Sequence, residues 1–206
     1  MRRAARRLQA LSSPRGLAVA TLATALALAS PLDAATRKHK IPLTCSRGGD
    51  QVHPLDVTVP DRVAQGGRYT VRIDGYPSGK IEHAGLRYIH DMHAEYVVPA
   101  GTKYVEGSGK IVPSTGTANV AKTARVVHKN GVVHFVLPAK VEAGTSYTPP
   151  SFEFQLEVTA APGNDLLLKL LRYSLYANAV VVGDTLAVCD PKPSPYPLAT
   201  TTVVKP

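Results

Sequence analysis

Four side chains within one short stretch could coordinate a metal ion: His83, His90, Met92 and His93. Imidazole and thioether groups bind copper, and imidazole also binds zinc, so this segment predicts a copper or zinc site. In a regular strand, however, His90 and Met92 would point to one face, and Asp91 and His93 to the other. A bulge would bring the ligands closer together. Without one, these are polar residues on the solvated edge of a strand.

Hydrolytic chemistry finds little support in the sequence. The Gly-x-Ser-x-Gly motif of the common serine hydrolases does not occur. Asp91, Glu95 and Glu106 could supply a pair of carboxylates for acid–base catalysis, but nothing distinguishes them from surface charges. We therefore expect a protein that is not an enzyme and uses no cofactor. A secreted hydrolase is kept as the weaker alternative.

Two further features could serve binding. Tyr88, Tyr96 and Tyr104 could line a groove for a sugar or a lipid, or they could be rim residues of the core. The segments at residues 74–80 and 138–150 are rich in turn-forming residues, and we expect them to be contact surfaces.

The N-terminus predicts export. Residues 1–35 combine a basic start, an alanine- and leucine-rich run over residues 16–29, and small residues suited to cleavage. The apolar run is shorter than the ~20 residues of a membrane-spanning helix. We expect a cleaved signal peptide, no transmembrane anchor after cleavage, and a secreted or extracytoplasmic protein of the cell envelope.

Export changes the interpretation of the only two cysteines, Cys45 and Cys189. In an oxidising compartment an even cysteine count favours a disulfide, which would close the two ends of one domain. The alternative is a pair of independent buried thiols.

The charge balance argues against nucleic acid as a partner. Removing residues 1–35, which hold five arginines and one aspartate, lowers the net charge from +9 to +5. The remaining Lys and Arg residues are scattered and form no run that could follow a phosphate backbone. The expected partner is an envelope protein, a glycan or a lipid, and the oligomeric state is left open.

The remaining pattern is that of an all-β protein. Apolar and polar residues alternate over residues 55–59, 69–73 and 152–158. Asn130-Gly131 predicts a type I′ hairpin that pairs Lys129 with Val132. We expect an antiparallel immunoglobulin-like β-sandwich of about eight to ten strands over residues 36–190.

Two segments are harder to assign. Residues 166–173 are leucine-rich and fit either a strand or a helix, with the strand favoured because they lie among other strands. Residues 191–206 are rich in Pro and Thr, and we expect a disordered tail.

Several short motifs resemble those of a group of small exported actinobacterial proteins of unknown function. The motifs are Leu43-Thr44-Cys45, Val98-Pro99-Ala100-Gly101-Thr102, Ala143-Gly144-Thr145, Pro149-Pro150 and Cys189-Asp190-Pro191. The segment at residues 90–93 and the leucine run depart from the group's pattern. The resemblance implies a disulfide-closed β-sandwich outside the membrane and no particular activity.

Taken together, the residues predict an exported, non-catalytic binding or structural module of the cell envelope or the extracellular medium. The alternative function is extracytoplasmic copper or zinc binding through His83, His90, Met92 and His93.

Overall fold

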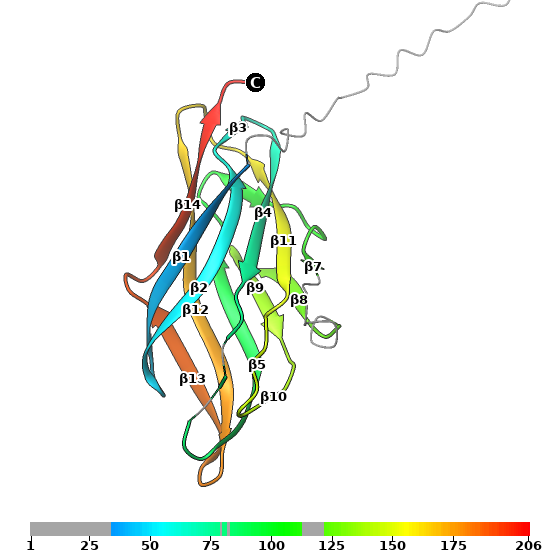
Figure 1. Ribbon diagram of the computed structural model, residues 1–206. Helices are drawn as coiled ribbons and strands as arrows, with labels where there is room; N and C mark the ends of the chain where they lie inside the picture. The colour runs from blue at the N-terminus through cyan, green and yellow to red at the C-terminus, as the bar shows by residue number, and fades with distance from the viewer. Residues whose placement is uncertain (1–33, 79, 82, 113–121) are drawn as a thin grey trace, which may run out of the picture.

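The computed structural model describes residues 34–78, 80–81, 83–112 and 122–206 (Figure 1). These residues form fourteen strands joined by turns and loops, with no helix among them. The strands are β1 (Ala34–Cys45), β2 (Gly49–Pro60), β3 (Arg62–Ala64), β4 (Arg68–Gly75), β5 (Leu86–Val97), β6 (Thr102–Tyr104), β7 (Lys110–Val112), β8 (Arg125–Lys129), β9 (Val132–Leu137), β10 (Val141–Glu142), β11 (Ser151–Val158), β12 (Asp165–Ala179), β13 (Gly183–Pro191) and β14 (Tyr196–Val204). The expected all-β class is confirmed, but the strands outnumber the eight to ten that we expected.

One curled sheet makes two facing layers (Figure 1). Its strand order is β6-β11-β4-β2-β1-β13-β12-β5-β9-β8, with every neighbouring pair antiparallel. The first layer holds β11, β4, β2 and β1, and the second holds β12, β5, β9 and β8. At one end of the molecule β13 joins the layers by pairing with β1 and β12. At the other end β14 joins them, antiparallel to β12 and parallel to β3.

Apolar side chains at alternate strand positions fill the space between the layers. Phe152, Phe154 and Leu156 of β11 are almost fully buried. Phe152 stacks on Phe135 of β9 with ring centroids 4.6 Å apart, and it also contacts Tyr96 of β5. These rings hold β11 against the opposite layer and form the centre of the core.

The Asn130-Gly131 hairpin forms as predicted. β8 and β9 pair Lys129 with Val132 and Val126 with Phe135. Both turn residues have positive φ, 52° and 75°, as a type I′ turn requires.

The predicted disulfide is confirmed, but it does not close the two ends of the domain. Cys45 and Cys189 are directly opposite each other on β1 and β13, with Cα atoms 3.9 Å apart. The bond joins two neighbouring strands of the sheet. The fold continues after Cys189 through β14, which ends at Val204.

The expectation of a disordered tail over residues 191–206 is wrong. β14 pairs with β12 from Thr202 opposite Asp165 to Tyr196 opposite Leu170. Leu198, Ala199 and Val203 are buried. The prolines at 191, 193, 195 and 197 precede or begin the strand, whereas the apolar residues that follow complete the core.

The two remaining expectations have different outcomes. Residues 166–173 belong to strand β12, so the favoured strand assignment is correct. Residues 1–33 of the expected signal peptide lie outside the described residues. Ala34 and Ala35 begin β1, opposite Pro60 and Val59. In the described part of the chain, no helix is long and apolar enough to cross a membrane.

Candidate functional site

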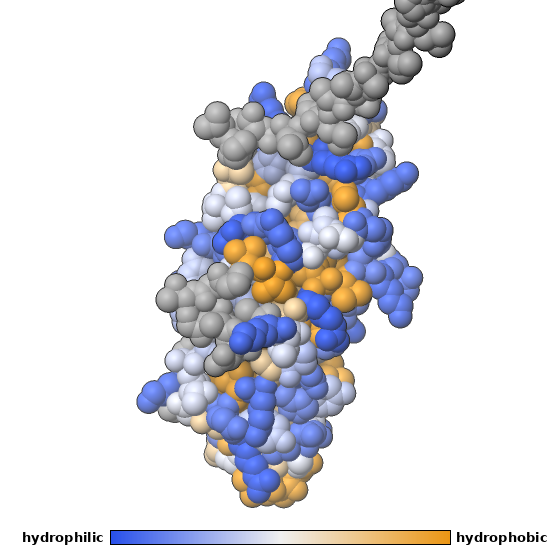
Figure 2. Space-filling model, turned by 90° about the vertical axis from the view of Figure 1, so that its right-hand side faces the viewer, coloured by the Kyte–Doolittle hydropathy of each residue, from blue (hydrophilic) through white to orange (hydrophobic). Residues whose placement is uncertain are grey.

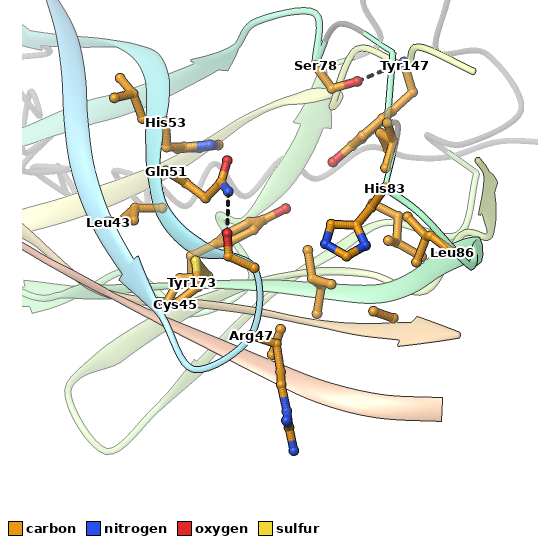
Figure 3. Close-up of a pocket in the computed structure, with 18 of the residues that line it drawn as sticks. Leu43, Cys45, Arg47, Gln51, His53, Ser78, His83, Leu86, Tyr147 and Tyr173 are labelled. Carbon is orange, nitrogen blue, oxygen red and sulfur yellow. Dashed lines mark hydrogen bonds between the residues drawn. A yellow bond between two sulfur atoms is a disulfide. The ribbon is translucent and has the colours of Figure 1, made fainter. Parts of the chain in front are cut away.

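A cavity of about 780 Å³ lies between the two layers, at the end of the molecule where β13 joins them. One wall comes from β1 and β2, and the opposite wall comes from β12 and β13. The rim comes from residues 76–78, 80–81, 83, 86, 147 and 149. Figure 3 shows the side chains of His53, His83, Tyr147 and Tyr173 pointing into this space.

The sequence leaves this space open because inward side chains become small along β12. Leu166, Leu168 and Leu170 fill the core at one end of the strand. After Leu170 the register of β12 shifts by one residue, so the inward positions change from even-numbered to odd-numbered residues. Ala177 and Ala179 occupy these inward positions at the cavity. The facing positions of β13 are also small: Thr185, Ala187 and Cys189. Short side chains on two paired strands cannot reach the opposite layer, so the layers enclose a void there.

Most of the described wall is apolar. Leu43, Leu86, Ile89 and Leu175 line it together with the alanines of β12 and β13. The disulfide between Cys45 and Cys189 is part of the same wall, so the covalent link lies directly at the cavity. Such a lining favours a ligand with a hydrocarbon surface.

Polar rings form the floor of the cavity. His53 of β2 stacks on Tyr173 of β12, with ring centroids 5.1 Å apart and an interplanar angle of 26°. Burial lowers the pKa of His53 to about 4, so its imidazole is neutral at physiological pH. Burial also raises the pKa of Tyr147 and of Tyr173, so both phenols stay protonated at physiological pH.

A smaller cavity of about 30 Å³ lies below this floor and shares His53, Tyr147, Pro149 and Tyr173 with the main cavity. The Tyr147 hydroxyl donates a hydrogen bond to the Met92 sulfur, 2.7 Å away. The floor therefore offers uncharged donors and acceptors to a polar group of a ligand, and the bond to Met92 fixes the Tyr147 ring.

The charges at the cavity are positive. Arg47 and Lys80 line it, and the described lining includes no carboxylate. Figure 3 shows His83 directed into the cavity and Arg47 directed away from it. A ligand with an apolar body and an uncharged or anionic end fits this distribution better than a cationic ligand does.

The segments at residues 74–80 and 138–150, which we expected to be contact surfaces, both contribute to this one cavity. Tyr76, Pro77, Ser78 and Lys80 come from the first, and Tyr147 and Pro149 from the second. None of Tyr88, Tyr96 and Tyr104 is among the residues that line it. Tyr96 is a core residue, 2 % exposed.

The predicted metal-binding segment contains a β-bulge, which the sequence analysis had named as one of two possibilities. Asp91 has a φ of 47°, a conformation that aspartate tolerates better than most residues. The register against β12 shifts here, because Ser174 pairs with His93 and Tyr176 with His90. Two residues of β5 therefore face one residue of β12.

This bulge reverses the alternation of side chains, so the expectation that His90 and Met92 share a face is wrong. Met92 is 1 % exposed and lies in the core. His90 lies on the outer face, with Nδ1 2.9 Å from an Asp91 oxygen and Nε2 3.3 Å from an Asp184 oxygen. It also stacks on Tyr176.

The structure does not bring the four predicted ligands together. His83 lines the cavity, with Nδ1 3.2 Å from the Ala84 carbonyl oxygen, whereas His90 lies on the outer face. No group of three or more His, Cys, Asp and Glu side chains within the described residues is arranged to hold a metal ion. Metal binding through His83, His90, Met92 and His93 remains a prediction from the sequence.

His53, Tyr147, Tyr173 and Ala177 were not recognised as site residues from the sequence. Three of them are common core residue types, and none belongs to a motif. The one available signal is the change from leucine to alanine at the inward positions of β12. It becomes informative only when β12 is known to be one long strand.

Comparisons with known proteins give the fold context. No protein-family model matches the chain, and no curated protein matches it. Similar solved structures include one described as a membrane anchored protein from Corynebacterium diphtheriae, at 10% identity and a TM-score of 0.42, over 84% of this chain and 38% of that one.

Two further similar structures are well-covered single domains. One is the sixth cohesin of Acetivibrio cellulolyticus scaffoldin B, at 10% identity and a TM-score of 0.37, over 82% of this chain and 100% of that one. The other is the collagen-binding domain of a Staphylococcus aureus adhesin, at 9% identity and a TM-score of 0.34, over 67% and 88%. Likenesses at this level carry no argument about ligands or partners.

Proposed function

We propose that this protein is an exported, non-catalytic binding module that holds a small apolar ligand in the cavity between its layers. It acts in the cell envelope or in the extracellular medium. The single observation that carries the proposal is the cavity itself, about 780 Å³ in volume and lined mainly by apolar side chains. Small-molecule sites have volumes of roughly 300–1,000 Å³, and they combine apolar walls with a few polar groups.

The arrangement of polar groups supports binding rather than catalysis. His53 is neutral and stacked, and its neighbours are two phenols whose pKa values are raised by burial. These groups can hold the polar end of a ligand, but at neutral pH they provide no activated nucleophile. The disulfide supports a location outside the cytoplasm, because such bonds persist in oxidising compartments.

The charge distribution narrows the ligand class. The described lining has cationic side chains at Arg47 and Lys80 and no carboxylate. We therefore propose an amphiphile with a hydrocarbon body and a polar or anionic end, such as a fatty acid or a single-chain lipid.

The test is a fluorescence titration with a dansyl-labelled fatty acid. We expect saturable uptake by the native protein, and uptake weakened at least about tenfold by Ala177→Phe, which places a ring in the cavity. Val188→Phe on the opposite face of β13 is the matched control and should bind as the native protein does. Absence of uptake by the folded native protein would overturn the proposal. So would equal uptake by the two variants.

Copper or zinc binding is the alternative function from the sequence, and no structural observation favours it over ligand binding in the cavity. The burial of Met92 removes the thioether from any site that includes the outward-facing His90.

A further inference from the structure

The turn between β12 and β13 exposes three consecutive valines to solvent. Val180, Val181 and Val182 are 59%, 92% and 68% exposed. In Figure 1 this turn is the lowest point of the molecule, at the opposite end from the C-terminus. Figure 2 shows apolar surface at the same lower tip.

The geometry of the turn does not require valine. Ala179 pairs with Gly183, and Gly183 has a φ of 65°, which supplies the left-handed residue that a short hairpin loop needs. β-branched residues are poor turn formers, whereas Gly, Asn, Asp and Ser are favoured. The Val180 amide donates to the Gly85 carbonyl oxygen at 2.8 Å, so the tip is also held in place.

More apolar surface continues from the tip along the same hairpin. Tyr176 of β12 is 39% exposed and Leu186 of β13 is 45% exposed, and the two are directly opposite each other. Exposed apolar side chains that gather in one place mark a surface of interaction, whereas single ones need no explanation.

Three cationic side chains come from segments at this end of the molecule. Arg47 and Lys80 line the cavity together with Val182, and Arg87 follows Leu86, which pairs with Ala179. Within the described part of the chain, none of these three cations has a carboxylate partner.

Asp184 is the carboxylate nearest to the tip in the sequence, and it already has hydrogen-bond partners on the protein. Asp184 accepts a hydrogen bond from Asn178 at 2.7 Å and lies 3.3 Å from His90. An apolar tip with cations around it has the chemistry of a segment that inserts shallowly into a membrane with anionic headgroups.

We propose that residues 180–182 insert into a lipid bilayer that carries anionic headgroups, with Arg47, Lys80 and Arg87 at the headgroup level. Because Val182 also lines the cavity, this orientation places one side of the cavity near the bilayer surface. The inference goes beyond the proposed function and does not require the cavity to be occupied.

The test uses the absence of tryptophan from the sequence. In a Val181→Trp variant the single indole reports the environment of the tip. We expect a blue shift of its emission with vesicles of phosphatidylcholine and phosphatidylglycerol, and little change with phosphatidylcholine alone. Val127→Trp is the matched control, because Val127 is exposed (41%) on β8 and should show no shift.

Co-sedimentation with the same vesicles gives the affinity. Val181→Asp should reduce binding at least about tenfold, whereas Val127→Asp should not. Three results would overturn the proposal: no binding of the folded native protein to either vesicle, binding that Val181→Asp leaves unchanged, or dimerisation through the tip in the absence of lipid that Val181→Asp abolishes. Fatty-acid uptake without vesicles is measured separately, so failure of membrane binding and failure of ligand binding are distinguishable.

Discussion

His53 and Tyr173 stack on each other at the floor of the cavity, although β2 and β12 are separated in the sheet by β1 and β13. The curl of the sheet brings these two side chains together. Their contact forms the floor on which a ligand in the cavity would rest, and it buries a titratable group.

The burial of His53 predicts a dependence of stability on pH. The imidazole has a pKa of about 4 in the folded protein and an ordinary value of 6.5 in the unfolded chain. Between these values the unfolded chain binds a proton that the folded protein does not. The free energy of unfolding should therefore fall by up to about 3 kcal/mol as the pH drops from about 6.5 to about 4.

Urea unfolding at several pH values across this window checks the prediction. His53→Phe keeps an aromatic ring against Tyr173 and removes the titration, so its stability should depend less on pH. Burial also lowers the pKa of His39, so part of the acid sensitivity should persist in this variant. An identical pH profile for the native protein and His53→Phe would contradict the assignment.

The disulfide should stabilise the fold strongly. Cys45 and Cys189 are 144 positions apart in the sequence, and the chain-entropy model gives about 5 kcal/mol for a loop of this length, less any strain. Exchanging both cysteines for alanine should lower the free energy of unfolding by about 2–5 kcal/mol. It should also weaken fatty-acid uptake, because both residues line the cavity. Urea unfolding measures the first effect, and an unchanged midpoint would show that the pair contributes little.

The C-terminal strand should be indispensable. Removing residues 196–206 would expose Leu166 and Leu168 of β12 and would take away the buried Val203. We expect loss of soluble folded protein on expression. Removal of only Lys205 and Pro206, which are exposed and follow β14, is the control and should have no effect. A stable folded protein that ends at residue 195 would refute the role given to β14.

The Asn130-Gly131 turn should be sensitive to a change that causes no clash. A Cβ added at Gly131 meets no atom within 4 Å, so Gly131→Ala isolates the cost of the positive φ. We expect a loss of about 1–2 kcal/mol in the free energy of unfolding. Thermal or urea unfolding measures it, and no loss would mean that the turn relaxes to another conformation.

These elements show what the sequence could predict. The hairpin and the disulfide follow from local chemistry, since Asn-Gly selects one turn type and two cysteines in an exported chain leave one pairing. The cavity could not be predicted, because it depends on pairings between segments far apart in the chain. The same holds for β14, whose prolines indicated disorder when its partner β12 was not known.

The bulge at Asp91 is a third case. The alternation of side chains predicted one shared face for His90 and Met92, but an extra position enters β5 between them and turns Met92 into the core. Asp91 is a weak sign of the bulge, because aspartate is depleted in strands and tolerates positive φ, but one aspartate does not fix the position of a bulge.

Metal addition distinguishes the two functions that the sequence offered. If Cu(II) or Zn(II) binds the folded protein, the unfolding midpoint rises with metal concentration, and the rise should be lost in a variant with His90→Asn and His93→Asn. With Met92 in the core, we expect no such rise. A metal-dependent rise that requires both histidines would favour the copper or zinc alternative.

The most direct measurement is an NMR titration of alanine methyl groups with decanoic acid. The methyls of Ala177, Ala179 and Ala187 line the cavity, whereas that of Ala199 is buried on β14, outside the cavity. The account predicts saturable shifts at the three cavity methyls and an unchanged Ala199 signal. Signals that stay unchanged at all three, or shifts only at alanines outside the cavity, would contradict the claim that this cavity is the binding site.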